Sequence, residues 1–530
     1  MNMCKHPMQK AATVKNQIER VNDMAESNAA GGVLAYDFGT GGIKAALFAS
    51  DGRRVDSGFA AYETFYPESG FHEQSPEDWW RATVDSTRAL LAKLSPEQIA
   101  GIRAIGISGH SLGVVPLDAE GRLLRARVPI WSDSRAGAEA EAFFAALGES
   151  ADAWYERTGC GFPPGLYSAF KLMWFRAHEP EWFARAATIL GTKDYINFRL
   201  TGVRATDNSY ASGSGVYDLR ARRYAPDLIA ATGLPTDIFP EIVPSTRVLG
   251  TLTAAAAAEL GLPQTVQVVA GGVDNSCMAL GAGAYKEGRA YNSLGSSSWI
   301  AISSAEPVID ARTKPYVFDH VVPGQYASAL AIFSAGTSHT WLRDILFPGA
   351  ENPYAEMDRL AEASGIGAHG LFFNPTLAGG SSLDVTPAMR GAFANLDLRH
   401  TRADMVRAVM EGVAFGLRQA LEELRRLVPV AEPLVLVGGG AKAPLWRQIY
   451  ADVYGLKVAR AAIGQQAAAL GAAVVAGVGC GLWKDFDVVD AFAGSCDGHE
   501  PDPAARAEYD VLFKRYTSLT RALGEWARGE

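Results

Sequence analysis

The sequence predicts an α/β protein with two related lobes that grip one phosphorylated ligand. Two glycine- and hydroxyl-rich turns, at residues 39–42 and 295–298, each lie between two apolar segments of strand length. Such a turn presents several backbone N–H groups on one concave side, which suits phosphate oxygens. Between the turns, strand patterns alternate with helical patterns, which is typical of layered α/β domains.

The first turn belongs to a β-hairpin and not to one of the common nucleotide-binding loops. A dinucleotide fold would place Gly-x-Gly-x-x-Gly at the start of a helix, but the sixth position here is Lys44 and the next segment stays strand-like. After a turn signal at residues 50–52, residues 55–62 can return as a third strand. No Gly-x-x-x-x-Gly-Lys-[Ser/Thr] string occurs, which excludes a P-loop. Asp37 therefore lies at the entrance of a hairpin.

The next elements place polar residues at the end of a strand. Spacing of apolar residues predicts a helix around residues 76–94, and residues 102–107 read as a strand that runs into His110 and Ser111. Ligands bind at such strand ends in open α/β sheets. Helical patterns follow at residues 136–147, 169–177 and 182–187, and we interpret residues 235–251 as a surface connection.

The second half begins after a strand-to-helix corner. A strand at residues 266–270 meets a glycine pair and then Asp274, whose carboxylate is placed to point into a cleft. Later, a strand at residues 434–437 meets three glycines, and Pro444 opens a helix. This second glycine corner allows a flat ring or a phosphate to lie against the backbone.

Composition limits the class of protein. The 530 residues fit two large domains, which we place at residues 32–283 and 284–525 after a loose tail at residues 1–31. A net charge of −9 argues against nucleic acid or an anionic membrane as a main partner. Five scattered cysteines without C-x-x-C spacing predict a cytoplasmic protein and no zinc site. Residues 467–483 are uncharged but mostly Ala and Gly, which favours a buried helix over a membrane span.

In this order and spacing, the segments resemble the FGGY carbohydrate kinases of the hexokinase/actin superfamily, over residues 33–483. The strings that carry the resemblance are Asp37-Phe38-Gly39-Thr40, Glu73-Gln74 with Trp79-Trp80, Trp131-x-Asp133-x-Arg135, Phe170-Lys171-Leu172-x-Trp174, Lys193-Asp194-Tyr195 before Leu200-Thr201-Gly202, Gly271-Gly272-x-Asp274-Asn275, and Gly438-Gly439-Gly440-Ala441-Lys442-x-Pro444-Leu445-Trp446.

The resemblance implies two ribonuclease H-like (actin-like ATPase) domains with a central cleft, sugar in the first domain and ATP mainly in the second. It also implies phosphoryl transfer, which needs a hydroxyl nucleophile, a metal and donors around the transferring group. Asp274 resembles the family's general base. Asp37 resembles the carboxylate that holds Mg²⁺ directly or through water.

The resemblance further implies which residues contact the nucleotide. We expect the first hairpin to line the transferring phosphoryl group, the second to form another phosphate loop, and two later turns to flank the nucleotide. The expected residues are Gly39, Thr40, Gly41 and Lys44, then Gly295 and Ser296, then Gly336 and Thr337, and finally Gly440 and Pro444.

The expected sugar contacts are His110, Ser111, Trp131, Asp133, Asp274 and Asn275. Xylulose kinases typically carry Gly-Gln-Met-His-Gly where this chain has Gly109-His110-Ser111-Leu112-Gly113, whereas Trp131, Asp133 and Arg135 resemble their pattern. The first candidate substrate is thus a ketopentose such as xylulose. The alternatives are a polyol such as erythritol or glycerol, a hexonate or a deoxyketose. From another class, an actin-like nucleotide-dependent regulatory protein would share the hairpins, and a homodimer is one candidate assembly.

Several of these residues also have a purely structural interpretation. Asp274 could cap a helix N-terminus, and a histidine on an apolar strand, such as His110, is commonly a buried structural residue. Asp133 and Arg135 could simply pair with each other. Asp37 could be only a turn residue.

Overall fold

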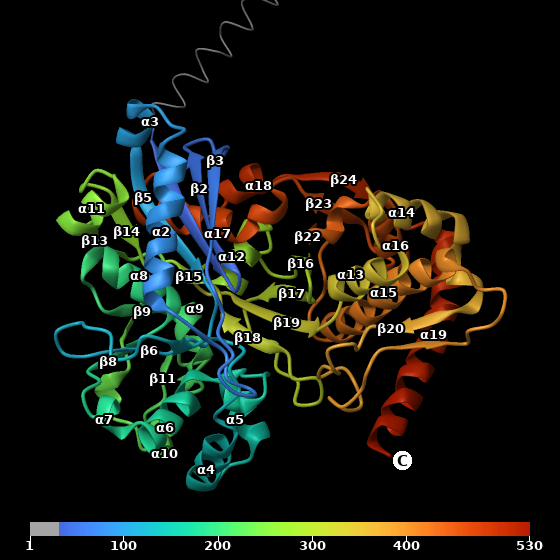
Figure 1. Cartoon of the computed structure of the whole chain (residues 1–530), viewed down its shortest axis with the longest axis horizontal. Coiled ribbons are helices and arrows are strands. Elements are labelled where there is room, and N and C mark those ends of the chain that lie inside the picture. Colours follow the sequence, from blue (N-terminus) through green and yellow to red (C-terminus); the bar gives the residue numbers. More distant parts are fainter. Residues whose placement is uncertain (1–30, 530) are drawn as a thin grey trace, which may run out of the picture.

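The computed structural model describes residues 31–529 and shows two layered α/β halves, each with a seven-stranded sheet (Figure 1). Of the predicted tail, residues 1–30 lie outside the described residues. Within the described part, no helix is both long and apolar enough to cross a membrane.

The first sheet is built around the first predicted hairpin. β1 and β2 pair antiparallel from Gly32 opposite Ala49 to Gly39 opposite Gly42, and β5 and β14 continue the sheet as parallel strands on the other side of β1. In the order β13, β14, β5, β1, β2, β3, the strands are Val248–Thr251, Gln267–Val269, Ile102–Gly109, Gly32–Gly39, Gly42–Ala49 and Arg54–Ala61, with β15 (Gly272–Val273) pairing with β5.

The second sheet repeats this plan, which confirms the predicted duplication. β16 and β17 form an antiparallel hairpin, β19 continues it antiparallel, and β22 and β23 run parallel on the other side of β16. In the order β18, β19, β17, β16, β22, β23, β24, the strands are Tyr316–Asp319, Tyr326–Ile332, Ser298–Ser304, Ala290–Leu294, Leu434–Val437, Val458–Ala461 and Ser495–His499.

The helices and small strands of the first half form two groups, one that packs on its sheet and one that packs into a separate core away from the sheet. The predicted helix at residues 76–94 is α2, which begins at Pro76 because Ser75 caps it and ends at Leu91, with Trp79 and Trp80 buried. The helices are α2 (Pro76–Leu91), α3 (Pro96–Ala100), α4 (Gly137–Leu147), α5 (Ala151–Thr158), α6 (Ser168–His178), α7 (Pro180–Phe183), α8 (Thr192–Thr201), α9 (Asn208–Ala211), α10 (Pro226–Thr232), α11 (Ala254–Leu260) and α12 (Asp274–Gly281). The small strands are β4 (Glu73–Gln74), β6 (Val115–Leu117), β7 (Val128–Pro129), β8 (Thr188–Leu190), β9 (Ala205–Asp207), β10 (Tyr217–Asp218), β11 (Arg223–Tyr224) and β12 (Glu241–Val243).

The second half has its core around one long helix. α15 is buried along most of its length and packs on β17, β19 and β20. The helices and strands not yet named are α13 (Gly336–Leu346), α14 (Pro353–Ser364), β20 (Phe372–Asn374), β21 (Ala392–Ala394), α15 (Arg402–Leu427), α16 (Pro444–Tyr454), α17 (Ala467–Gly479), α18 (Val488–Ala493) and α19 (Pro503–Arg528).

Helix α17 packs on the sheet of the other half. It is buried over most of its length, as predicted for residues 467–483, and contacts β1, β5 and α12. Figure 1 shows this late, orange-red helix beside the blue strands of the first sheet. Glycines allow the close approach: a Cβ on Gly106 would lie 2.2 Å from the Ala472 oxygen, and one on Gly471 would lie 1.8 Å from the Cys277 oxygen. The predicted domain limits, residues 32–283 and 284–525, assign α17 to the second domain by its place in the sequence. These limits stay a prediction.

Two expectations about elements were wrong. Residues 235–251 are not merely a surface connection, because they contain β12 and the edge strand β13, which pairs antiparallel with β14. A register shift between Val248 and Gly250 hides the period-two pattern of this strand. The helix expected at residues 182–187 is instead α7, which begins earlier because Pro180 occupies its first turn.

Candidate active site

The first hairpin places the predicted metal carboxylate between two polar neighbours. Asp37 lies opposite Lys44 in the β1–β2 register, and Lys44 Nζ is 3.5 Å from Asp37 Oδ2. From β5, the Ser108 hydroxyl donates to Asp37 Oδ1 at 3.3 Å. Burial raises the pKa of the Asp37 carboxyl, and the Lys44 ammonium opposes this. Asp37 is thus more than a turn residue, since its carboxylate is held by both adjacent strands.

The exposed turn of this hairpin is anchored from behind. Trp131 Nε1 donates to the Thr40 hydroxyl at 3.0 Å, and Gln74 Nε2 donates to the Thr40 carbonyl at 2.7 Å. The Tyr62 hydroxyl donates to the Gly39 carbonyl. Gly41 lies at the tip with open space around it. The turn therefore presents its outer face to solvent while its inner face is fixed.

Asp274 stands at the predicted strand-to-helix corner, as the first residue of α12 after β15. A Cβ on Gly271, whose φ is +72°, would lie 2.1 Å from the Ile107 carbonyl, so only glycine fits this close corner. The Asn275 N–H donates to Asp274 Oδ1 at 2.7 Å, and no side-chain cap closes the helix. Burial raises the pKa of Asp274 to about 7, and the negative charge of Asp37 adds to the shift. The two carboxylates are therefore close enough to interact, and one of them titrates near neutrality.

A cavity of about 610 Å³ lies beside the second hairpin. Its walls contain Gly295, Ser296, Gly336, Gly440 and Pro444, all predicted nucleotide contacts. The Gly336 N–H donates to the Gly295 carbonyl at 3.0 Å, so the two predicted phosphate turns are joined directly. A Cβ on Gly336 would lie 2.4 Å from that carbonyl oxygen, so glycine is required for this contact. Thr337 does not line the cavity, but its N–H donates to the Ser296 carbonyl at 3.1 Å.

Aromatic residues that the sequence analysis did not assign complete this cavity. His339 and Tyr354 lie on α13 and α14, and Trp446 lies on α16. The His339 ring stacks on Tyr354 with ring centres 5.5 Å apart and lies 5.0 Å from the Trp446 ring. Burial lowers the pKa of His339 to about 4, so the ring is neutral near pH 7. Only the tertiary packing of three helices reveals this wall, although Trp446 is part of one of the sequence strings that resemble the FGGY family.

His110 and Ser111 are buried at the end of β5. Nδ1 of His110 lies 3.3 Å from the Thr192 hydroxyl, and Nε2 has no hydrogen-bond partner among the described residues. Burial lowers the pKa of His110 to about 4. Lys171, fully buried on α6, donates to the carbonyls of Leu112 and Ile130 at 3.1 and 2.7 Å. This lysine therefore holds the segment after His110 against the segment before Trp131.

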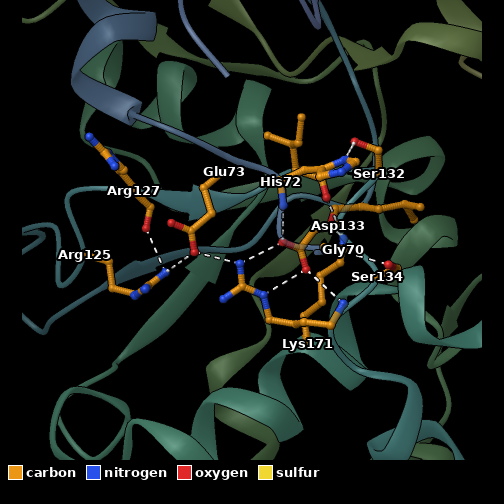
Figure 2. Close-up of polar contacts among 12 residues, drawn as sticks. Gly70, His72, Glu73, Arg125, Arg127, Ser132, Asp133, Ser134 and Lys171 are labelled. Carbon is orange, nitrogen blue, oxygen red and sulfur yellow. Dashed lines mark hydrogen bonds and ion pairs between the residues drawn. The ribbon is translucent and has the colours of Figure 1, made fainter. Parts of the chain in front are cut away.

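Asp133 belongs to a buried ion-pair network (Figure 2). Arg135 donates to both carboxylate oxygens of Asp133, at 2.9 and 2.7 Å, and also to Glu73 at 2.7 Å. The His72 N–H donates to Asp133 Oδ2 at 2.8 Å, and Arg125 approaches Glu73 from the other side. The pairing of Asp133 with Arg135, one of the two expectations, is thus present and fully buried. The expected sugar contact of Asp133 stays a prediction, whereas Trp131 is 38% exposed and accessible.

Two family models together match most of the described chain. The model described as the N-terminal domain of the FGGY family of carbohydrate kinases matches residues 32–281, and the C-terminal domain model matches residues 290–480. The chain belongs to the FGGY family of carbohydrate kinases. As such it is a sugar kinase, which sets aside the alternative of an actin-like regulatory protein.

The sequence and structure relatives of this carbohydrate kinase align with it over almost the full length of both proteins. Xylulose kinase of Bacillus subtilis is 30% identical over 489 residues, which are 92% of this chain and 96% of that protein. The gluconokinase of Bacillus licheniformis is 27% identical over 504 residues, 93% of this chain and 96% of that protein. The crystal structure of xylulose kinase from Rhodospirillum rubrum superposes with a TM-score of 0.85 at 31% identity, covering 94% of this chain and 100% of that chain. The predicted two-domain, actin-like ATPase fold is confirmed by these similarities.

Proposed function

We propose that this carbohydrate kinase transfers a phosphoryl group from ATP, with Mg²⁺, to a terminal hydroxyl of a small sugar, with a ketopentose such as xylulose as the first candidate. One observation carries the proposal. The Asp274 carboxyl has a pKa near 7 and interacts with a second carboxylate, that of Asp37. Asp37 lies on the first hairpin, whose turn is anchored and flanked by glycines. A base, a cation ligand and backbone donors are what phosphoryl transfer to an alcohol requires.

Asp274 acts as the general base in this proposal. Its carboxylate accepts the proton of the attacking hydroxyl, and a pKa near the operating pH suits that task because both capture and release of the proton remain easy. Its side chain is only partly buried, so a substrate in the cleft can reach it. The neighbouring Asn275 is also partly accessible and fits a sugar contact.

Asp37 fits a magnesium site with few protein ligands. Among residues 31–529 no group of three or more His, Cys, Asp or Glu side chains could enclose a metal ion. Mg²⁺ is commonly held by one or two carboxylates together with waters and phosphate oxygens, so this donor set suits it. When bound, ATP supplies the phosphoryl group and Mg²⁺ neutralises its charge. Lys44 stands beside Asp37 as a further positive charge.

Thr40 is arranged to donate to the phosphoryl group. A threonine hydroxyl has one donor hydrogen and two acceptor lone pairs. Because the Trp131 N–H already donates to the Thr40 oxygen, the hydroxyl hydrogen is left to donate elsewhere. The adjoining glycines, Gly39 and Gly41, leave space for phosphate oxygens to approach the backbone.

The cavity beside the second hairpin suits the rest of ATP. The turn at Gly295 offers backbone N–H groups for phosphates and is held in place by the N–H groups of the turn at Gly336, and the aromatic wall of Tyr354 and Trp446 suits a flat base. Gly440 and Pro444 border the same space. The cavity is large enough for a nucleotide-sized ligand.

The choice of a ketopentose rests on the named relatives and the Trp131 segment. Because residues 109–113 differ from the xylulose-kinase string, a polyol, a hexonate or a deoxyketose is the alternative. Coupled measurement of ADP release should test D-xylulose, L-xylulose, ribulose, erythritol, glycerol and gluconate as acceptors. We expect the highest kcat/KM with a xylulose isomer. A higher kcat/KM with erythritol or gluconate would reassign the substrate, and no acceptor-stimulated ADP release would refute the proposal.

A further inference from the structure

A buried glutamine to which the sequence analysis gave no role lies directly behind the phosphoryl turn. Gln74, on β4, is fully buried. Its Nε2 donates to the Thr40 carbonyl and to the Thr64 hydroxyl, each at 2.7 Å. Its Oε1 accepts from Trp79 Nε1 at 2.9 Å. Both amide hydrogens and the amide oxygen of this side chain are therefore engaged.

Trp79 determines which way the Gln74 amide points. An indole N–H can only donate, so the amide oxygen must face Trp79 and the NH₂ group must face Thr40 and Thr64. Trp79 is itself fully buried on α2, which leaves its ring no freedom to turn away. The same ring packs edge-on against His110 with ring centres 5.8 Å apart, so the contact chain reaches the segment expected to bind sugar.

The bond to Thr40 also controls the next backbone N–H. The Thr40 carbonyl and the Gly41 N–H belong to one planar peptide unit, in which they point in opposite directions because the peptide is trans. Holding the carbonyl inward toward Gln74 therefore turns the Gly41 N–H outward, away from the protein interior. Glycines on both sides of Thr40 give this peptide unusual freedom to rotate, so an external restraint matters more here than in an ordinary turn.

We propose that Gln74 is a positioning residue for phosphoryl transfer: it fixes the Thr40–Gly41 peptide so that the Gly41 N–H faces the transferring group, and Trp79 fixes the Gln74 amide. This inference rests on the proposed function of the first hairpin. Preorganised backbone donors stabilise developing charge without reorganising during the reaction, so Gln74 contributes to kcat more than to sugar binding.

The decisive comparison is Gln74→Glu against Thr64→Val. The first change keeps the shape and the acceptor for Trp79 but removes the donor to Thr40. The second removes the other hydrogen-bond partner of the same amide and leaves the Thr40 bond in place. With wild type as reference, we expect Gln74→Glu to lower kcat about tenfold to one hundredfold with the sugar KM changed less than about threefold, because one indirectly held donor is misplaced. Thr64→Val should keep kcat within about threefold of wild type.

Hydrogen exchange of the peptide spanning residues 39–44 gives a readout that does not need a known substrate. Exchange should quicken in Gln74→Glu and stay unchanged in Thr64→Val. Equal kcat values, or equal exchange rates, in the two variants would overturn the positioning role. If wild type phosphorylates no acceptor, the proposed function fails, and the exchange rates alone decide the inference about Gln74.

A second variant covers the case in which Gln74→Glu does not fold. Trp79→Phe removes the N–H that orients the amide while keeping an aromatic ring on α2. We expect kcat to fall about threefold to tenfold and the exchange at residues 39–44 to quicken, since the amide can then flip. Wild-type kcat and exchange in a folded Trp79→Phe protein would overturn the proposal.

Discussion

Replacing Asp274 by Asn should lower turnover by orders of magnitude while stabilising the protein at alkaline pH. The change keeps the shape of the side chain but removes its ability to take a proton. General base catalysis contributes about 10²- to 10⁴-fold, so kcat should fall by that factor with ATP binding retained. In wild type, kcat/KM should rise about tenfold per pH unit up to a pH of about 7 and then level off, because only the ionised carboxylate acts as base.

The stability change follows from the raised pKa of the same carboxyl. Folding raises this pKa from 3.8 to about 7, so the native state favours the protonated form. The contribution of this carboxyl to wild-type stability is therefore fully present below about pH 4 and is lost as pH rises through about 7. A shift of this size corresponds to at most about 4 kcal/mol, reduced to roughly 2–3 kcal/mol because the side chain is partly exposed to water. Asn carries no such penalty.

Thermal unfolding of wild type and Asp274→Asn at pH 4 and pH 8 measures this difference. We expect closely similar midpoints at pH 4, and at pH 8 a midpoint higher by roughly 4–12 °C in the variant, for a cooperative unit of 150–250 residues. The kcat of the variant should stay low at both pH values. A variant with near-normal turnover, or one whose stability relative to wild type does not depend on pH, would refute the reasoning.

Three further substitutions test other parts of the site. Trp131→Phe loses the indole N–H that donates to Thr40, so kcat should fall about threefold to tenfold with unchanged thermal stability, and an unaltered kcat would contradict this coupling. Lys171→Met leaves the buried Leu112 carbonyl without its donor, while the Ile130 carbonyl keeps the Asp133 N–H, so unfolding measurements should show a loss of about 1–3 kcal/mol together with a higher sugar KM; an unchanged KM would show that the lysine is only structural. Gly336→Ala would push a methyl group against the Gly295 carbonyl, so the ATP KM should rise by about tenfold or more, and an ATP KM equal to wild type would argue against this turn as a phosphate contact.

Much of the fold could be predicted because its signals are local. Glycine turns separate the hairpin strands, and Ser75 and Pro76 mark the start of α2. The strand β22 is an uninterrupted apolar run before three glycines. The edge strand β13 escaped prediction because it is short and irregular, so its pairing with β14, and not its composition, makes it a strand.

The candidate site divides in the same way. Asp37 and Asp274 could be found because each lies near glycines, Asp37 close to the end of a strand and Asp274 at a strand-to-helix corner. A carboxylate at such a position is commonly functional. The orientation of Gln74, the aromatic wall with His339 and Tyr354, and the burial of Asp133 could not be found. Each depends on side chains from elements distant in sequence, so no spacing along the chain encodes them.

The sequence by itself determined the duplicated hairpins and the carboxylate corner, because turns, strand ends and glycine requirements are properties of adjacent residues, and the class of chemistry followed from the resemblance of these motifs to the FGGY kinases. Only the tertiary structure decided that α17 closes the first sheet, that Trp79 fixes the Gln74 amide behind Thr40, and that Asp37 and Asp274 interact. The raised pKa of Asp274 belongs to this second group. It results from burial and from a neighbouring charge, and both of these exist only when the chain is folded.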